Sequence, residues 1–333
     1  MKHCGMDVHL RSTTAQVLDP ETGAIASINV RTHRRALTEW LGGQEKMHVV
    51  LEASTVSHWV AELVEELGHE VVVVDPNRTS AVAVAGGFKK TDALDAATLA
   101  WLSSKGAIVP SHRPSAELRA RRRTLRLRNR LVRSRGDLVR TIRSLLASQG
   151  FTLPASRALF TVRVRSLGDA VAAQFEPLLT LIESFDVRLR EIDRQLGLEA
   201  KQDPVVRRLM TVDGIGPITA SAFRVVVADP SRFKDARSVA AYVGLVPAVY
   251  SSGTAERVGH ITCRGDRLLR AYLVEAAQSL LHACKRGSEL RDWALALQAR
   301  VGNRKAAVAV ARKYCSIMWS MWRKETDFRR FRR

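Results

Sequence analysis

The stretch HVVLEASTVSHWVAELVEELGHEVVVV, residues 48–74, decides the fold of the first third of the chain. Residues 48–51 form a short apolar run that predicts a buried strand. Residues 56–67 carry helical periodicity up to Gly68, a residue that commonly ends helices. The four valines at 71–74 are typical of a strand that is covered on both faces. The stretch therefore predicts a strand, a helix and a second strand.

The flanking sequence extends this pattern in both directions. Residues 19–23, DPETG, have the residue types of a turn between two strands. The further strands are expected at residues 6–9, 14–18 and 24–30, and the further helices at residues 33–41 and 92–102. Three strands followed by alternating helices and strands predict an α/β domain with a mixed sheet, over residues 1–110.

The charge of the chain points to a polyanionic partner. Its 333 residues carry 53 Lys and Arg against 33 Asp and Glu, a formal net charge of +20. Such an excess is typical of nucleic-acid binding, because neutralised phosphates release counterions. No segment approaches the roughly 18 to 20 continuous apolar residues of a membrane-spanning helix. The sequence therefore predicts no membrane-spanning helix and no membrane partner.

The cysteines indicate a reducing compartment. Cys4, Cys263, Cys284 and Cys315 show no paired short spacing, so they fit neither a zinc site nor a disulfide framework. We therefore expect reduced thiols in a cytoplasmic protein, associated with the bacterial nucleoid.

An arginine-rich segment follows the α/β domain. Residues 113–143 hold twelve arginines and two acids, a net +10 that is half of the whole excess. Apolar residues recur every seven positions, which predicts a long helix with one apolar seam; they are Leu118, Leu125, Val132, Val139 and Leu146. A second helix at residues 170–201 could pack against it as an antiparallel pair. We expect a basic helical coiled-coil connector at residues 111–203. Its phosphate-binding residues are expected to be Arg119, Arg121, Arg122, Arg123, Arg126 and Arg130.

The last region, residues 204–333, is expected to be mostly helical. A Gly214-Ile215-Gly216 turn precedes an apolar helix at residues 218–227. Free backbone N–H groups in such a turn can hold a phosphate, as in helix-hairpin-helix DNA binders. A plain helix-start turn explains the same residues. The tail at residues 329–333, RRFRR, is either a backbone-binding or a disordered segment.

Four acids stand out by their positions. Asp7 lies in the first strand and Glu52 ends the strand of residues 48–51, while Asp92 and Asp95 share one helix face. An acid in an apolar strand is unfavourable unless it is paired or binds a cation. Converging carboxylates would bind Mg²⁺ or Mn²⁺, and two such ions can stabilise both oxygens of a phosphodiester exchange. Taken singly, each acid could be a helix cap or a surface charge.

His9 lies close to Asp7 in the sequence. We expect its side chain on the opposite face of the strand, with a structural role rather than a role as a metal ligand.

Several segments resemble one known family. GMDVH at 5–9, LEAS at 51–54 and KTDALDA at 90–96 resemble the Asp-Glu-Asp-Asp signature of the IS110 family of insertion-sequence transposases. The resemblance covers nearly the whole chain in order. It continues through GIGP at 214–217, YVGLVP at 242–247, SSG at 251–253 and GHIT at 259–262.

The resemblance implies an architecture and a set of partners. The family has an RNase H-like (RuvC-like) N-terminal domain, a helical connector and a C-terminal transposase domain with a reactive serine. The family also implies a structured guide RNA, encoded by the element, that pairs with donor and target DNA. These implications come from the resemblance and not from composition or spacing.

By the same resemblance, Ser252 is the nucleophile and Ser251 is the nearest alternative. Without the resemblance, the segment would be an ordinary Ser-Gly turn. Basic residues follow that could neutralise a phosphorane; they are Arg257, His260, Arg264, Arg267 and Arg270. Of these, Arg257, Arg264 and Arg267 are the expected nucleic-acid contacts. The chain departs from the family at Cys263 and Asp266, where a basic residue and Asn are usual, which affects local nucleic-acid contacts more than the chemistry.

The leading hypothesis is a guide-RNA-directed recombinase that forms a covalent 5′-phosphoserine intermediate and acts as a dimer or tetramer. One alternative is a hydrolytic RNase H-like nuclease or junction resolvase, in which metal-bound water attacks the phosphate. A second alternative is a non-catalytic nucleic-acid-binding protein.

Overall fold

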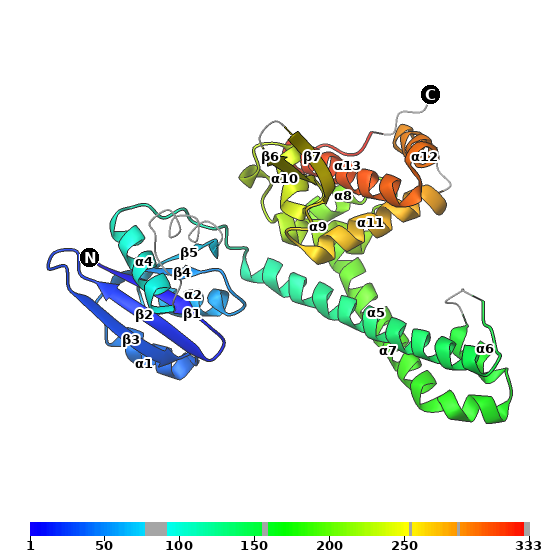
Figure 1. The fold of residues 1–333 in the computed structure, drawn as a ribbon, viewed down its shortest axis with the longest axis horizontal. Helices are drawn as coiled ribbons and strands as arrows, with labels where there is room; N and C mark the ends of the chain where they lie inside the picture. The colour runs from blue at the N-terminus through cyan, green and yellow to red at the C-terminus, as the bar shows by residue number, and fades with distance from the viewer. Residues whose placement is uncertain (77–91, 155–158, 253–254, 285–286, 330–333) are drawn as a thin grey trace. The chain divides into compact units, whose positions relative to one another are not determined.

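The computed structural model describes residues 1–76, 92–154, 159–252, 255–284 and 287–329 (Figure 1), with the backbone alone at residues 92–94 and 250–258. The chain divides into two compact units, Met1–Arg113 and Pro114–Arg333. The expected boundary near residue 110 lies close to this division. A separate boundary at residue 203 stays a prediction, because the helical connector and the last region fall in one unit.

The first unit contains a five-stranded mixed sheet with the strand order β3-β2-β1-β4-β5. The strands β1, β2 and β3 pair antiparallel, whereas β4 runs parallel to β1 and to β5. The strands are β1 Lys2–Val8, β2 Ser12–Leu18, β3 Ile25–Arg31, β4 Met47–Glu52 and β5 Glu70–Val74. The helices are α1 Arg34–Gly42, α2 Ser57–Glu66 and α4 Asp92–Ser104. The predicted mixed sheet is confirmed.

Alternation along β1 sends its side chains to two different layers. Cys4, Met6 and Val8 are buried in the core that α1 and α2 complete. His3 and Gly5 lie on the other face, where α4 packs. The Nδ1 atoms of His3 and His48 lie 2.7 Å and 2.6 Å from the Ser103 hydroxyl at the end of α4. The α4 face therefore holds polar groups where the other face is apolar.

The contact between α4 and β1 is made by backbone atoms. A Cβ at Gly5 would lie 1.9 Å from the Ala96 carbonyl oxygen and 2.6 Å from the Ala100 nitrogen. Only a glycine leaves room for this approach. Gly5 thus fixes how closely α4 lies on the sheet.

The second unit begins with two long antiparallel helices, α5 Ala116–Ser148 and α7 Asp169–Gln202 (Figure 1). The predicted seam is confirmed, since Leu118, Leu125 and Leu146 are buried and Val132 and Val139 are half-buried. The short helix α6 Phe160–Arg165 packs on α7 near the connection.

The remaining helices surround one core that includes Phe223, Tyr314 and Met318. They are α8 Pro204–Leu209, α9 Pro217–Val227, the 3₁₀ turn η1 Pro230–Arg232, α10 Ala236–Val243, α11 Arg267–His282, α12 Glu289–Val301 and α13 Asn303–Lys324. The mostly helical C-terminal region is confirmed. Within the residues that the structure describes, no helix is both long and apolar enough to cross a membrane.

One element differs from expectation. The segment around Ser252 was expected to be a loop, but it forms an antiparallel hairpin of β6 Pro247–Ser252 and β7 Ala255–Ile261. Two short runs on either side of a Gly-containing turn are a hairpin signal. The loop expectation overlooked this signal.

We expect Gly5→Ala to destabilise the first unit, because the new methyl group would meet backbone atoms of α4 that cannot rotate away. Overpacking of this kind costs about 1–3 kcal/mol. The urea-unfolding midpoint of the purified protein measures the loss. Gly42→Ala is the matched control, since nothing lies within 4 Å of its added Cβ. Equal midpoints for the two variants would contradict the prediction.

Candidate functional site

Two candidate carboxylates occupy neighbouring positions at the ends of parallel strands. Met6 of β1 pairs with Leu51 of β4, so Asp7 and Glu52 follow side by side in the same register. Asp7 lies two residues after Gly5, and Glu52 lies two residues after Val50, which packs against Leu99 of α4. Residues two apart in a strand share a face. Both carboxylates therefore lie on the face of the sheet that α4 covers.

The helix α4 brings the third and fourth acids to the same end of the sheet. Its last turn lies against His3, at the start of β1, and Ala96 lies against Gly5 in the middle of that strand. The helix thus runs antiparallel to β1, and its first turns point toward the end of β1 that holds Asp7. Asp95 lies in these turns and Asp92 begins the helix. The side chain of Asp92 lies outside the described residues.

The donor set fits a hard divalent cation, because carboxylate oxygens are the ligands that Mg²⁺ and Mn²⁺ prefer. Two carboxylates at adjacent strand positions also repel unless a positive charge lies close. Among the side chains that the structure describes, no three His, Cys, Asp or Glu residues are grouped closely enough to hold a metal ion. Asp7, Glu52 and Asp95 are all among those side chains, so the structure does not bring these three carboxylates close enough to share one ion, and the four-carboxylate set stays a prediction.

His9 contradicts the expectation from the sequence. Its Nε2 atom lies 3.2 Å from Oδ2 of Asp7, whose side chain is only 15% exposed. The prediction placed His9 on the opposite face and was wrong, because residues two apart along an extended chain point the same way. His9 therefore touches one of the candidate metal-binding carboxylates.

One set of arginines on α5 points toward acids of the same unit. Arg128 pairs with Asp193 of α7, and Arg135 pairs with Asp186, each through two guanidinium nitrogens. These arginines lie seven residues apart, as do their partners. The two ion pairs therefore link α5 and α7 across the seam between these helices.

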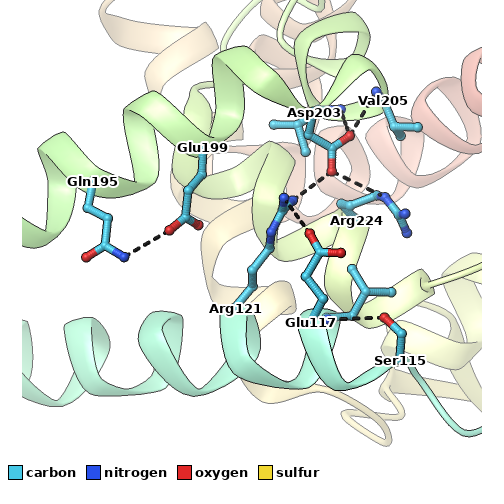
Figure 2. Close-up of polar contacts among 10 residues, drawn as sticks. Ser115, Glu117, Arg121, Gln195, Glu199, Asp203, Val205 and Arg224 are labelled. Carbon is cyan, nitrogen blue, oxygen red and sulfur yellow. Dashed lines mark hydrogen bonds and ion pairs between the residues drawn. The ribbon is translucent and has the colours of Figure 1, made fainter.

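Arg121, seven residues before Arg128, pairs with Asp203 at the end of α7 (Figure 2). Its Nη1 atom lies 2.7 Å from Oδ2 of Asp203, and Arg224 of α9 lies 3.6 Å from the same oxygen. Oδ1 of Asp203 accepts hydrogen bonds from Val205 N and Val206 N, at 2.9 Å and 3.2 Å, and so caps α8. This carboxylate is 9% exposed and ties α5, α7, α8 and α9 together.

Three members of the predicted phosphate-binding set have partners within the protein, and their phosphate role stays a prediction. Arg121 is engaged by Asp203, and the neighbouring Arg122 is engaged by Asp266 at the start of α11. Arg119 donates from Nη1 to the Pro114 carbonyl at 2.7 Å. Their partners lie up to 144 residues away, so the helical periodicity of α5 gave no sign of them.

A second set of arginines faces solvent. Arg123, Arg126, Arg130 and Arg133 are exposed and recur at spacings of three and four residues, which places them on one face of α5. Within the described part of the chain, no ion pair or hydrogen bond engages their side chains. We call these four residues the outer arginine face. Arg133 was not in the predicted set, although its spacing from Arg126 and Arg130 could have identified it.

The Gly-Ile-Gly turn has a packing explanation for its first glycine. Gly214 has a φ of +82°, and a Cβ there would lie 2.5 Å from the Tyr314 hydroxyl and 2.9 Å from the Ala276 carbonyl. That hydroxyl donates to the Asp213 carbonyl at 2.7 Å. Gly214 therefore lies against α11 and α13, which is a packing reason for a glycine at this position; its expected phosphate role stays a prediction. Gly216 begins α9 with open space around it, so a phosphate contact there stays a prediction.

Ser252 is the last residue of β6 and pairs with Ala255 of β7, while Ser251 pairs with Glu256. The side chains of Ser251, Ser252 and Arg257 lie outside the described residues. Arg264 and Arg267 are exposed at the other end of the hairpin, where β7 leads into α11.

Two family models match the chain. Residues 4–150 match the DEDD transposase family of IS110, and residues 206–292 match the model described as "Transposase IS116/IS110/IS902 family". The first match includes the acids of β1, β4 and α4, and the second includes the hairpin with Ser252.

Curated transposases resemble the chain over most of its length. A probable family 20 transposase of Pseudomonas aeruginosa is 33% identical over 291 residues, 84% of this chain and 85% of the relative. The transposase for insertion sequence element IS1328 of Yersinia enterocolitica is 26% identical over 308 residues, 90% of each chain. The transposase for IS1111A of Coxiella burnetii is 28% identical over 197 residues, 56% of this chain and 54% of the relative. The chain therefore belongs to the IS110 family of insertion-sequence transposases, enzymes that move DNA.

Proposed function

We propose that the first unit is an RNase H-like (RuvC-like) catalytic domain, in which Asp7, Glu52, Asp92 and Asp95 bind Mg²⁺ or Mn²⁺. The observation that carries the proposal is the pair Asp7 and Glu52, at adjacent parallel strand ends beneath the first turns of α4. The strand order and the family support the same assignment. When bound, the metal supplies Lewis-acid stabilisation of charge on the phosphate oxygens.

Side chains of the first unit would position the scissile phosphate. The carboxylates would fix the position of the scissile phosphate through the ion that they bind. His9, whose Nε2 lies 3.2 Å from Oδ2 of Asp7, is placed to hold that carboxylate in position.

We infer that Ser252 is the nucleophile. Its Oγ loses a proton and bonds to the phosphorus, the bond to the 3′-oxygen breaks, and that oxygen takes up a proton. The products are a 5′-phosphoserine and a free 3′-hydroxyl. A 3′-hydroxyl of a second strand then attacks the ester and releases Ser252 with its proton. The ester retains the energy of the broken bond, so rejoining requires no ATP. The family match over residues 206–292, which include Ser252, supports this assignment.

The outer arginine face of α5 is the proposed phosphate-binding surface. Its four guanidiniums are exposed, whereas those of Arg128 and Arg135 are paired with aspartates. The nucleic acids would be the element ends, the target DNA and a guide RNA encoded by the element; the guide RNA rests on the family resemblance alone. A dimer or tetramer would bring the acids and Ser252 together at one phosphate, in the bacterial cytoplasm on the nucleoid.

Replacing the serine should abolish the covalent intermediate. We expect Ser252→Ala to form no denaturant-resistant adduct with end-labelled element DNA, because no other group supplies the ester oxygen. Ser251→Ala is the matched control and should retain the adduct. Continued cleavage by Ser252→Ala would favour the hydrolytic nuclease instead.

Replacing an acid should remove cleavage while binding remains. We expect Asp7→Asn and Asp95→Asn to slow Mg²⁺-dependent cleavage by about 100- to 1,000-fold, as the loss of several kcal/mol of stabilisation implies. Binding to the same DNA, followed by fluorescence anisotropy, should change little. Glu39→Gln removes an exposed acid of the same unit and should have no effect. Full cleavage without divalent metal would point to a different chemistry.

Replacing two outer arginines should change the salt dependence of binding. We expect Arg126→Gln with Arg130→Gln to reduce the slope of log K against log salt by about 2, since each phosphate contact contributes about 0.9. Arg135→Gln is the control, because its guanidinium is paired with Asp186. The outer face would lose its proposed role if the double variant and the control had the same slope.

A further inference from the structure

The base of the β6–β7 hairpin holds two loops, one with Gly244 and one with Gly265, whose backbones are in contact. A Cβ at Gly244 would lie 1.9 Å from the Arg264 carbonyl oxygen, and one at Gly265 would lie 1.9 Å from the Tyr242 carbonyl oxygen. Both glycines have positive φ, +79° and +88°. The Thr262 N–H donates to the Val246 carbonyl at 2.8 Å. The base of the hairpin is therefore a fixed junction.

The start of α11 holds this junction from one side. Arg270 donates from Nη1 to the Val243 carbonyl at 2.7 Å and to the Arg264 carbonyl at 3.3 Å. Asp266 follows Gly265 directly and caps α11, since its Oδ1 accepts from Leu269 N at 2.8 Å. A contact that holds Asp266 in place therefore also holds the base of the hairpin, because Asp266 follows Gly265 directly.

The partner of Asp266 is Arg122 of α5. Nη2 of Arg122 donates to Oδ2 of Asp266, whose side chain is 8% exposed. The Nε atom of Arg122 is buried and has no hydrogen-bond partner among the described residues. The Arg122 side chain is 32% exposed, and its Nη2 makes the contact with Asp266. Arg123, the next residue, belongs to the outer arginine face.

We propose that the Arg122–Asp266 ion pair is a positioning device, which fixes the hairpin that carries Ser252 relative to the helix that binds nucleic acid. The inference rests on the proposed function of Ser252 and of the outer arginine face. Asn at position 266 would keep the helix cap but not the ion pair, so Asp266→Asn tests the pair separately from the cap.

The structure offers a closely matched control for the test. Asp203 also caps a helix with Oδ1 and binds the neighbouring arginine, Arg121, with Oδ2. It is 9% exposed, against 8% for Asp266. Both Asp203→Asn and Asp266→Asn keep a helix cap and remove an ion pair with an arginine of α5, and Asp203→Asn also releases Arg224; only Asp266→Asn touches the hairpin base.

The experiment compares these two variants of the full-length protein on element DNA. We expect Asp266→Asn to slow adduct formation by about 10- to 100-fold, the loss that a small misplacement of a reacting group causes. Binding to the DNA should stay within twofold. Asp203→Asn should form adduct at nearly the wild-type rate per folded molecule, even where its melting temperature falls further.

Two further measurements keep the inference separate from the proposed function. Hydrogen exchange of residues 247–261 should be faster in Asp266→Asn than in Asp203→Asn, whatever the nucleophile is. Arg122→Gln should reproduce the effect of Asp266→Asn, and the double variant should add little, as for two members of one pair. Equal exchange and equal adduct rates in the two Asn variants would overturn the positioning role. If the proposed function is wrong, the Ser252→Ala variant will still cleave the element DNA.

Discussion

The backbone contact between α4 and β1 at Gly5 is the constraint on which the candidate active site depends. The Ala96 carbonyl occupies the space that any side chain at residue 5 would fill. This contact sets the register of α4 on the sheet, with Ser103 at His3 and the first turns toward Asp7. The contact brings the start of α4, which holds Asp92 and Asp95, to the end of the sheet face where Asp7 and Glu52 lie. A larger residue would displace the helix and its acids together.

Local patterns predicted most of the fold. The valine run, the heptad of leucines and valines and the turn at residues 19–23 each report on neighbours close in sequence, so strands and helices were found within a few residues of their observed ends. The position of Asp7 and Glu52 on one face also follows from alternation along two strands. Their pairing needed the parallel register of β1 and β4, which the structure supplies.

Most of the missed features depend on partners that are distant in the chain. Arg121 and Arg122 were indistinguishable from the solvent-facing arginines by sequence, because Asp203 and Asp266 lie 82 and 144 residues away. Gly214 was interpreted as a phosphate-binding residue because the Tyr314 hydroxyl that fills the space beside it comes from α13. His9 is a different case, since correct counting along the strand would have placed it beside Asp7.

The arginines of α5 fall into two sets, one paired with aspartates of α7 and one exposed to solvent, which composition alone does not separate. Arg128 and Arg135 occupy seam positions where a simple coiled coil would place apolar residues. Each forms an ion pair with an aspartate of α7, Arg128 with Asp193 and Arg135 with Asp186. A slide of α7 by one turn would leave these partly buried charges unmatched, and an unmatched buried charge is more unfavourable than a matched pair is favourable. The inner arginines therefore specify the register of the two helices. Because α7 leads directly into Asp203 and α8, that register also fixes where the outer arginines lie relative to the rest of the second unit.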